Sequence, residues 1–245
     1  MSAQSRMITR ASHAGLFLLI VVVGVFATSI AQASGFRASG WENGADGFES
    51  ALREAERDEL PMIVYFNTEW CKWCRKLNES YLPNHHVRSV LDYFVKVSVN
   101  PEDGAAEERL FERFGGGGYP GFFVVLPVAN GKPSKLSPFR KDGSLSPERF
   151  AQEISERAAI AYERSGIDLS RQGDCKAAIE EFETALQWTE SRQADLHFNI
   201  GRCYHLQARE QRNEELLDQA RSHYQDALRA DPNHAVSRKA LDSLD

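Results

Sequence analysis

The fold is decided by residues 61–76, which read PMIVYFNTEWCKWCRK. Met62 to Phe66 is a short apolar run of strand character, and Pro61 separates it from the helical pattern before it. Two cysteines separated by two residues, Cys71 and Cys74, follow where this strand leads into a predicted helix. The free N–H groups and the dipole of a helix N-terminus stabilise a thiolate, so the stretch predicts a reactive thiol on a strand-to-helix turn.

The two cysteines in this pattern have different expected roles. Only a thiolate attacks a disulfide, and Cys71, at the front of the helix, is predicted to be held as that accessible anion. Cys74, one turn further along, is predicted to attack the mixed disulfide and release the product. Lys72 adds a positive charge that favours the thiolate, and Trp70 and Trp73 are predicted to form apolar surface around the sulfur.

The same pair has plainer interpretations. Cys71 and Cys74 could form a structural disulfide, a redox-inert relic, or half of a zinc site. A zinc site needs a second pair of ligands at a compatible spacing, and His85 and His86 are adjacent rather than three to five residues apart. Both histidines are therefore predicted to lie at the start of a helix. Redox chemistry without a metal or a cofactor is the favoured interpretation.

The neighbouring segments alternate between helical and strand patterns. In order, the sequence predicts helix 46–59, strand 62–66, a helix from about residue 71, helix 85–93, strand 94–99, helix 105–114, strand 122–126, strand 135–140 and a helix opening at Ser146-Pro147-Glu148. Asn130-Gly131 is typical of a hairpin turn between the last two strands. This order indicates an α/β domain.

Residues 61–76 resemble the active-site strand and helix of thioredoxins. They are most similar to the exported thioredoxin-like branch that includes the C-terminal domain of the transmembrane disulfide interchange reductase. The resemblance extends over about residues 44–157, and Tyr119-Pro120 aligns with the cis-proline that family members hold beside the cysteines. It implies a thioredoxin fold, thiol:disulfide exchange, and a backbone at Tyr119 that pairs with a bound substrate chain. Lys96 aligns with a family lysine behind the site.

The sequence departs from the family pattern at three places. Tyr65 stands where thioredoxins carry a buried aspartate, which moves the proton of the inner cysteine. The proton of Cys74 would then have to be taken by Glu69, by Tyr65 itself or by water. Gly121 follows the proline where the family often has threonine, and the run 115–118 of four glycines is longer than the family loop requires. We expect these changes to affect the rate of thiol:disulfide exchange and the choice of substrate more than the ability to carry out the exchange.

After about residue 160 the strands stop and a helical pattern repeats. The first copy contains Gly166, Gly173-Asp174, Ala178, Phe182 and Ala185-Leu186, and the second contains Gly201, Tyr204, Ala220, Tyr224, Ala227-Leu228 and Asp231-Pro232. Over 159–233 this resembles the tetratricopeptide repeat, a helix pair of about 34 residues in which small residues let the helices approach. Seven extra residues lie within 208–218, and a closing helix is predicted at 235–244. Two copies are fewer than an independent solenoid usually needs, so we expect the repeats to be stabilised by packing against the first domain.

Two further cysteines, Cys175 and Cys203, lie within the repeats. Buried, inert thiols are expected at these positions. A structural disulfide between the two is the alternative, because the second helix of one repeat packs against the first helix of the next.

The N-terminus has the three parts of a secretory signal peptide. Basic residues precede an apolar stretch, and Ala31-Gln32-Ala33 supplies the small residues of a cleavage site. We predict a signal peptide at 1–33 and a linker at 34–43. An uncleaved anchor, and with it a membrane-tethered assembly factor, is the alternative. Either way the rest of the chain is expected outside the cytosol, in the periplasm.

The charge of the chain argues against one class of partner. The net charge is −6, and removing residues 1–33, which hold Arg6 and Arg10 and no acid, leaves 27 basic and 35 acidic residues, a net charge of −8. Binding of nucleic acid needs an excess of Lys and Arg, so no nucleic acid is expected.

These features predict a thioredoxin-like domain at 44–158 followed by all-α tetratricopeptide-like repeats at 159–245. The expected activity is that of a periplasmic thiol:disulfide oxidoreductase, and its preference for reducing protein disulfides rests on the resemblance alone. Its partners would be a protein disulfide or dithiol substrate, a membrane or soluble thiol protein that donates electrons, and a protein docked in the groove of the repeats. The alternative is a non-catalytic adaptor that binds proteins through the repeats.

Overall fold

The structure is a computed structural model that describes residues 40–127 and 132–244. The predicted signal peptide and the predicted turn at Asn130-Gly131 lie outside these ranges. Each helix within them is too short or too polar to cross a membrane.

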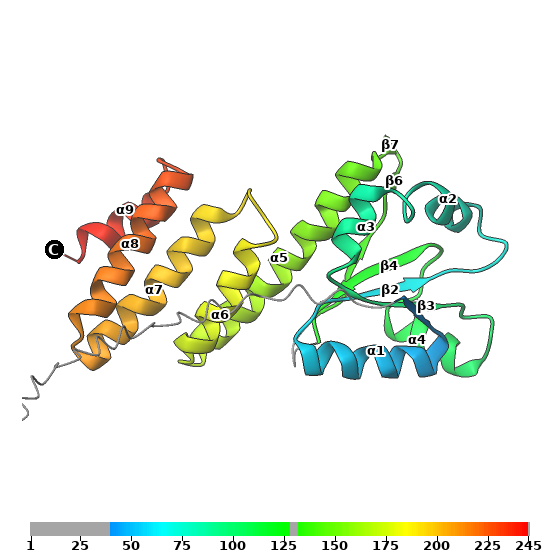
Figure 1. Cartoon of the computed structure of the whole chain (residues 1–245), viewed down its shortest axis with the longest axis horizontal. Helices are drawn as coiled ribbons and strands as arrows, with labels where there is room; N and C mark the ends of the chain where they lie inside the picture. Colours follow the sequence, from blue (N-terminus) through cyan, green and yellow to red (C-terminus); the bar gives the residue numbers. More distant parts are fainter. Residues whose placement is uncertain (1–39, 128–131, 245) are drawn as a thin grey trace, which may run out of the picture. The chain divides into compact units, whose positions relative to one another are not determined.

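A five-stranded sheet forms the centre of the first region (Figure 1). Its strands follow the order β1-β3-β2-β4-β5, with β1 at Trp41–Asn43, β2 at Met62–Phe66, β3 at Val95–Val99, β4 at Gly121–Val125 and β5 at Ser134–Leu136. The pairs β1–β3 and β3–β2 are parallel, whereas β2–β4 and β4–β5 are antiparallel. The carboxyl ends of β2 and β3 therefore meet the beginning of β4 at one edge of the sheet.

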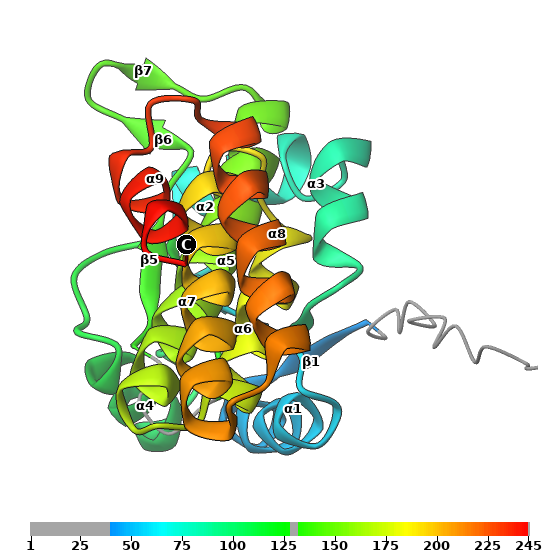
Figure 2. The ribbon, with the colours of Figure 1, turned by 90° about the vertical axis from the view of Figure 1, so that its left-hand side faces the viewer.

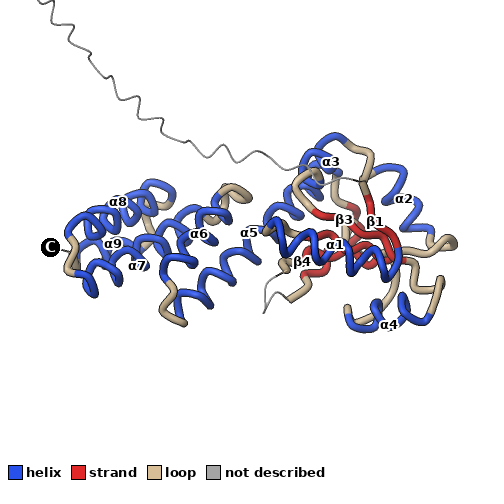
Figure 3. Tube along the Cα trace, turned by 60° about the horizontal axis from the view of Figure 1, so that its bottom comes forward, coloured by secondary structure: helices blue, strands red, loops and turns tan. Residues whose placement is uncertain are grey.

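Helices cover both faces of this sheet, as the red strands between blue helices in Figure 3 show. The helices of this region are α1 at Gly44–Asp58, α2 at Lys72–Ser80, α3 at His85–Leu91, α4 at Ala105–Arg113 and the first part of α5, which spans Pro147–Arg171. Alternate residues of β2 enter different apolar clusters. Val64 and Phe66 pack with α1 and α4, and Ile63 and Tyr65 pack with α2, α3 and α5. Because both faces are covered, all five residues of β2 are buried, which explains why the strand reads as a continuous apolar run.

Two details of the sheet differ from the sequence prediction. The predicted strand 135–140 is wrong as a single element: β5 ends at Leu136, and β6 at Phe139–Arg140 pairs instead with β7 at Gly143–Ser144 in a separate two-stranded sheet. Pro138 cannot donate to a strand ladder, and the Ser137 hydroxyl accepts the Phe139 N–H at 3.1 Å, so the chain turns between the two strands.

The second detail is β1, which the sequence analysis missed. It lies within residues 34–43, for which a linker was predicted, and Trp41 pairs with Lys96 of β3. Three residues are too few to show a strand period, and this strand forms because β3 offers an edge to pair with.

The second region is entirely helical in its described part. After α5 come α6 at Cys175–Leu186, α7 at Gln193–Gln211, α8 at Glu214–Ala230 and α9 at Ala235–Asp242. The predicted boundary between residues 158 and 159 falls inside α5. The N-terminal half of this helix brings Phe150 onto Phe122 of the sheet at 5.4 Å between ring centroids, and its C-terminal half packs on α6. One helix therefore belongs to both regions.

The paired helices of this region lie side by side (Figures 1 and 2), and they approach closely at glycines. A Cβ on Gly166 of α5 would lie 2.7 Å from the ring of Phe182 on α6. A Cβ on Gly201 of α7 would lie 2.8 Å from the ring of Tyr224 on α8. The glycine and the aromatic residue thus take the same relation in both helix pairs, as the repeat pattern predicts.

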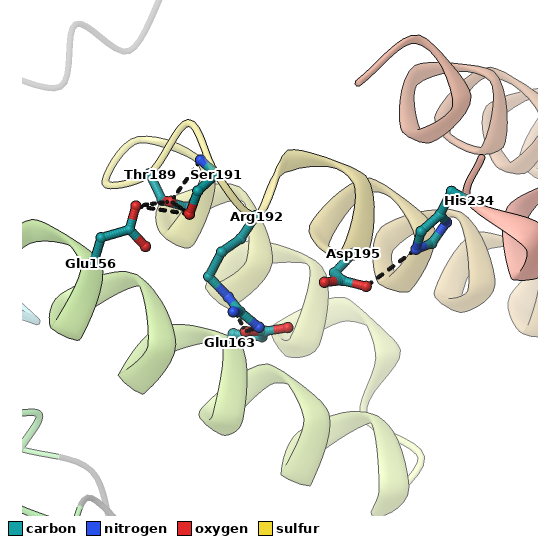
Figure 4. Close-up of polar contacts among 7 residues, drawn as sticks. All are labelled: Glu156, Glu163, Thr189, Ser191, Arg192, Asp195 and His234. Carbon is teal, nitrogen blue, oxygen red and sulfur yellow. Dashed lines mark hydrogen bonds and ion pairs between the residues drawn. The ribbon is translucent and has the colours of Figure 1, made fainter. Parts of the chain in front are cut away.

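The loop between α6 and α7 is attached to α5 by polar side chains (Figure 4). Thr189 and Ser191 donate their hydroxyl hydrogens to Oε1 of Glu156 at 2.7 and 2.9 Å. Arg192 forms an ion pair with Glu163 at 2.6 Å, and Glu163 is buried. These contacts hold the loop before α7 against α5.

The helical region also contacts the first one, so the expected support is confirmed. Trp188, in the same loop, packs edge-on against Phe94 with 5.2 Å between ring centroids. The hydroxyl of Tyr162 on α5 donates to the carbonyl oxygen of Glu59, which caps the end of α1, at 3.3 Å.

Candidate functional site

The cysteine pair lies at the sheet edge where β2 and β3 end. After β2, the N–H of Asn67 donates to the Val99 carbonyl oxygen at 3.0 Å, and its side-chain amide donates to the Ser98 hydroxyl at 2.8 Å. The N–H of Cys71 then donates to the carbonyl oxygen of Thr68 at 3.3 Å. This turn places Cys71 at the N-cap of α2, as the sequence predicts.

Cys71 and Cys74 form a disulfide whose Cα atoms lie 5.2 Å apart. The N–H of Cys74 points at Sγ of Cys71 at 3.0 Å, so the sulfur occupies the place of a capping acceptor. The two residues are 3% and 1% exposed. The predicted accessible sulfur is therefore nearly covered in the disulfide state, because the bond holds both sulfurs within the apolar cluster beneath α2.

An exposed tryptophan stands before the first cysteine. Trp70 is 63% exposed, yet its indole N–H donates to Glu102 at 2.8 Å. Its ring also meets that of Tyr119 edge-on at 5.7 Å, and Tyr119 stacks on Phe111 at 5.0 Å. Trp70 is thus a fixed apolar surface and not a free side chain.

The second tryptophan is supported in a similar way. Trp73, 46% exposed, lies against Phe139 with 4.8 Å between ring centroids, and the ammonium of Lys76 stands 5.5 Å from the Trp73 ring and 5.6 Å from the Phe139 ring. Phe139 also meets Tyr81 edge-on at 5.4 Å. Sequence reasoning missed Phe139, Phe111 and Glu102, because they reach the tryptophans only through long-range packing and carry no local motif.

The bond between Tyr119 and Pro120 is cis, as the resemblance implies. The residue after it pairs with the last residue of β2, since Gly121 faces Phe66 in the β2–β4 register. A Cβ on Gly121 would lie 3.2 Å from both the Phe66 Cβ and the ring of Phe123. A side chain at this position would therefore be tightly packed between the two strands and the Phe123 ring. The glycines at 115–118 all have positive φ, which explains the absence of side chains there.

Tyr65 lies beneath α2. Its hydroxyl donates to the carbonyl oxygen of Cys74 at 3.4 Å, and burial raises the pKa of Tyr65 far above its usual value, against a smaller opposing effect of Asn78. The phenol stays neutral at any physiological pH. It cannot take a proton from Cys74 and acts as a donor to the helix backbone.

Lys96, which aligns with the family lysine, is buried at the other end of the same sheet face. Its ammonium donates to the carbonyl oxygens of Leu91 and Phe94 at 3.1 and 3.3 Å. Burial lowers the pKa of Lys96, and the negative charge of Asp92 opposes that shift. The ammonium holds the turn that joins α3 to β3.

The remaining residues singled out in the sequence lie at the starts of helices or in the helical region. Lys72 is the first residue of α2 and is exposed, and His85 and His86 begin α3 after the N-cap Asn84, as predicted. Cys175 and Cys203 are buried free thiols.

The thiols of Cys175 and Cys203 interact with each other and with Ser170. Burial, with the neighbouring Cys203, raises the pKa of Cys175 to about 12, and Cys203 donates to the Ser170 hydroxyl at 3.5 Å. The Cys175 thiol is therefore protonated and poorly nucleophilic near neutral pH.

Comparison with known proteins shows what the first region is similar to. Residues 41–127 match a family model described as thioredoxin-like. Among solved structures, the chain is similar to the oxidised C-terminal domain of DsbD from Neisseria meningitidis, with 19% identity, a TM-score of 0.41, and coverage of 48% of this chain and 98% of that one. The reduced form of that domain gives 20% identity, a TM-score of 0.39, and coverage of 45% and 94%. A thioredoxin from Thermus thermophilus gives 22% identity, a TM-score of 0.39, and coverage of 49% and 88%.

No curated protein matches the chain. The family model and the order of the strands together show that residues 41–127 form a thioredoxin-like α/β domain, which an all-helical region follows.

Proposed function

We propose that this protein is a thiol:disulfide oxidoreductase that reduces protein disulfides in the periplasm through Cys71 and Cys74. One observation carries the proposal: Sγ of Cys71 occupies the N-cap of α2 and receives the N–H of Cys74 at 3.0 Å. When the disulfide is reduced, this N–H is aimed at a thiolate instead of a neutral sulfur. Hydrogen bonds to an ion are about twice as strong as neutral ones, so the cap favours the reactive form.

The first step forms a mixed disulfide. The Cys71 thiolate attacks one sulfur of a substrate disulfide, the substrate S–S bond breaks, and the other substrate sulfur leaves as a thiolate that takes a proton from solvent. The Cys71–substrate S–S bond takes its place, so no net electron transfer has yet occurred.

The second step releases the substrate. Cys74 gives its thiol proton to solvent and attacks Sγ of Cys71, and the second substrate sulfur leaves as a thiolate that takes a proton from solvent. The Cys71–Cys74 disulfide seen in the structure is the product. The substrate has gained two electrons and two protons, and a dithiol protein, soluble or in the membrane, must return the enzyme to its reduced form.

The surroundings of the pair suit an extended protein segment as substrate. Trp70 and Trp73 expose fixed apolar rings next to each cysteine, and Tyr119-Pro120 ends at the start of β4. The backbone of Tyr119 would pair with the substrate chain while the tryptophans contact its side chains. We propose that tetratricopeptide-like repeats at 159–245 dock a further protein, the substrate or the electron donor.

The location in the periplasm rests on the signal-peptide pattern of residues 1–33. An oxidising compartment would keep the pair oxidised until a donor reduces it. Mass measurement of the mature protein tests this point, since a cleaved chain begins after Ala33 and a tethered one retains the apolar segment.

Reduction of insulin by dithiothreitol tests the activity. The parent protein should accelerate precipitation of the insulin chains, and Cys71→Ser should reduce the rate to that of dithiothreitol alone, whereas the control Cys175→Ser should match the parent. Cys74→Ser should form the mixed disulfide but not resolve it, so mass spectrometry should find the substrate attached to Cys71. Equal rates for Cys71→Ser and the parent would remove the enzymatic function.

A second candidate function is that of a non-catalytic adaptor, in which the helical region binds a protein partner and the disulfide is structural. The observation in its favour is Tyr65, which stands where thioredoxins carry an acid and remains neutral. The same assay separates the two functions, since an adaptor predicts no activity in the parent protein.

A further inference from the structure

Three potential metal ligands come together between α7 and α8, far along the chain from the disulfide. They are His197 on α7 and His223 and Asp226 on α8. One ligand atom from each lies within 4.8 Å of the other two, and all three residues are partly buried. Within residues 40–127 and 132–244, these three residues have ligand atoms close enough to one another to hold a metal ion.

The spacing of the two imidazole rings is close to that of rings bound to one zinc ion. Nδ1 of His197 lies 3.2 Å from Nδ1 of His223. Two nitrogens each bound at about 2.0–2.1 Å with a tetrahedral angle between them lie about 3.3 Å apart. The distance between the two nitrogens therefore matches one edge of a tetrahedron of ligands around such an ion.

The helices explain why these side chains converge. His223 and Asp226 are three residues apart on α8, so they lie on the same face of that helix. α7 lies beside α8 in both views of the chain (Figures 1 and 2). The contact between the two imidazoles places His197 opposite His223.

Neighbouring side chains orient two of the ligands. Tyr204 stacks on the ring of His223 with 5.6 Å between ring centroids, and Arg229 forms an ion pair with the carboxylate of Asp226. A carboxylate has two oxygens, so Asp226 can bind an ion with one and keep Arg229 on the other. Such outer partners are typical of metal sites because they fix the direction of the ligand.

We propose that His197, His223 and Asp226 bind a divalent transition-metal ion of the zinc class. Imidazole nitrogen suits zinc, and two histidines with one carboxylate leave a fourth position for water or a further ligand. Without the ion, the short Nδ1–Nδ1 contact needs a hydrogen on one of the two nitrogens. Binding moves that hydrogen to Nε2 of the same ring, so that both Nδ1 lone pairs face the metal and the charge of the imidazoles is unchanged.

Isothermal titration of the full-length, oxidised protein with zinc chloride tests the proposal. We expect one zinc ion per chain. His223→Ala should weaken binding by at least about 100-fold, because loss of even an outer partner costs roughly 10–100-fold. The matched control is His205→Ala, which removes a histidine of α7 that contacts Tyr224 and lies outside the group, and it should bind zinc as the parent does.

A second variant guards against misfolding. Asp226→Asn keeps the shape of the side chain and removes its charge, so circular dichroism should match the parent while zinc affinity falls at least about tenfold. ¹⁵N NMR of the imidazoles should show zinc moving the Nδ1 signals of His197 and His223. The proposal is overturned if the parent binds no zinc, if His223→Ala or Asp226→Asn binds it as tightly as the parent, or if zinc leaves these signals unchanged.

Discussion

The Sγ atom of Cys71 shows how a single residue combines structure and chemistry. As the N-cap of α2 it fills the place that Ser, Asp or Asn usually takes, and it receives an N–H that would otherwise lack a partner in the helix. A sulfur that is a weak acceptor when neutral becomes a strong one as a thiolate. The same hydrogen bond therefore caps the helix in one redox state and favours the nucleophile in the other.

At the residue scale we predict that Tyr65→Phe leaves disulfide exchange within about twofold of the parent rate. The Tyr65 pKa is raised by burial, so the phenol stays protonated and gives no general-base help to Cys74. The change removes its hydrogen bond to the Cys74 carbonyl oxygen and should lower the free energy of unfolding by about 0.5–1.5 kcal/mol. Insulin reduction and urea denaturation measure the two effects. A rate loss above about tenfold in a folded variant would assign Tyr65 a direct part in exchange.

At the scale of elements, close approach between paired helices depends on glycine. Gly166 faces Phe182 across α5 and α6, and Gly201 faces Tyr224 across α7 and α8. Both aromatic rings are buried, so neither can move aside into solvent. The repeating pattern in the sequence thus has a direct structural cause, which is the distance between two helix backbones.

We therefore predict that Gly166→Ala destabilises the protein. The new Cβ would lie 2.7 Å from the Phe182 ring, and forcing a methyl group into a packed core costs about 1–3 kcal/mol. Any helix-propensity gain from alanine is about 1 kcal/mol and should not offset the clash. The control is Gly40→Ala, because a Cβ at that position would meet no atom of the described residues within 4 Å, and this variant should unfold as the parent does. Chemical denaturation should give a lower midpoint for Gly166→Ala than for Gly40→Ala, and equal midpoints would contradict the prediction.

At the scale of the whole molecule, the described residues of the two regions share packing instead of meeting through a linker. One apolar cluster runs from Ile63 of the sheet through Phe150 and Ala158 of α5 to Cys203 of α7. Trp188 adds a second connection by packing on Phe94. A continuous core predicts that the two regions unfold together.

Trp188→Ala tests this coupling. Removing the ring takes away its contact with Phe94, and we expect a loss of about 2–4 kcal/mol, below the value for a fully buried tryptophan because this one is half-buried. Because the two regions are expected to unfold together, hydrogen exchange of their slowest amides should become faster in α6–α9 and in β2–β4 alike. Trp70→Ala, which removes a tryptophan that is 63% exposed, is the matched control and should leave exchange in α6–α9 unchanged. Faster exchange confined to α6–α9 in Trp188→Ala would show that the helical region opens without the sheet and would contradict the prediction.

Much of the first region could be predicted from local patterns. The strand at 62–66, the helix after Cys71, the helix start at Ser146-Pro147 and the cis bond before Pro120 all follow from signals within a few residues or from the family resemblance, and the structure confirms them. Short strands were predicted poorly. β1, β6 and β7 have three residues or fewer and exist because a partner strand supplies the hydrogen bonds.

The features of the candidate site likewise fall into those that a local sequence pattern predicts and those that long-range packing creates. Spacing along one segment is enough to predict the two cysteines, their place at the front of a helix, and the glycine–aromatic pattern of the helical region. The rings that support Trp70 and Trp73, the contacts of Tyr65, and the meeting of His197 with His223 and Asp226 emerge only from the three-dimensional packing. The cause is distance along the chain. Phe139 and Trp73, or His197 and His223, become neighbours only when separate elements pack together, and a local sequence pattern carries no information about that packing.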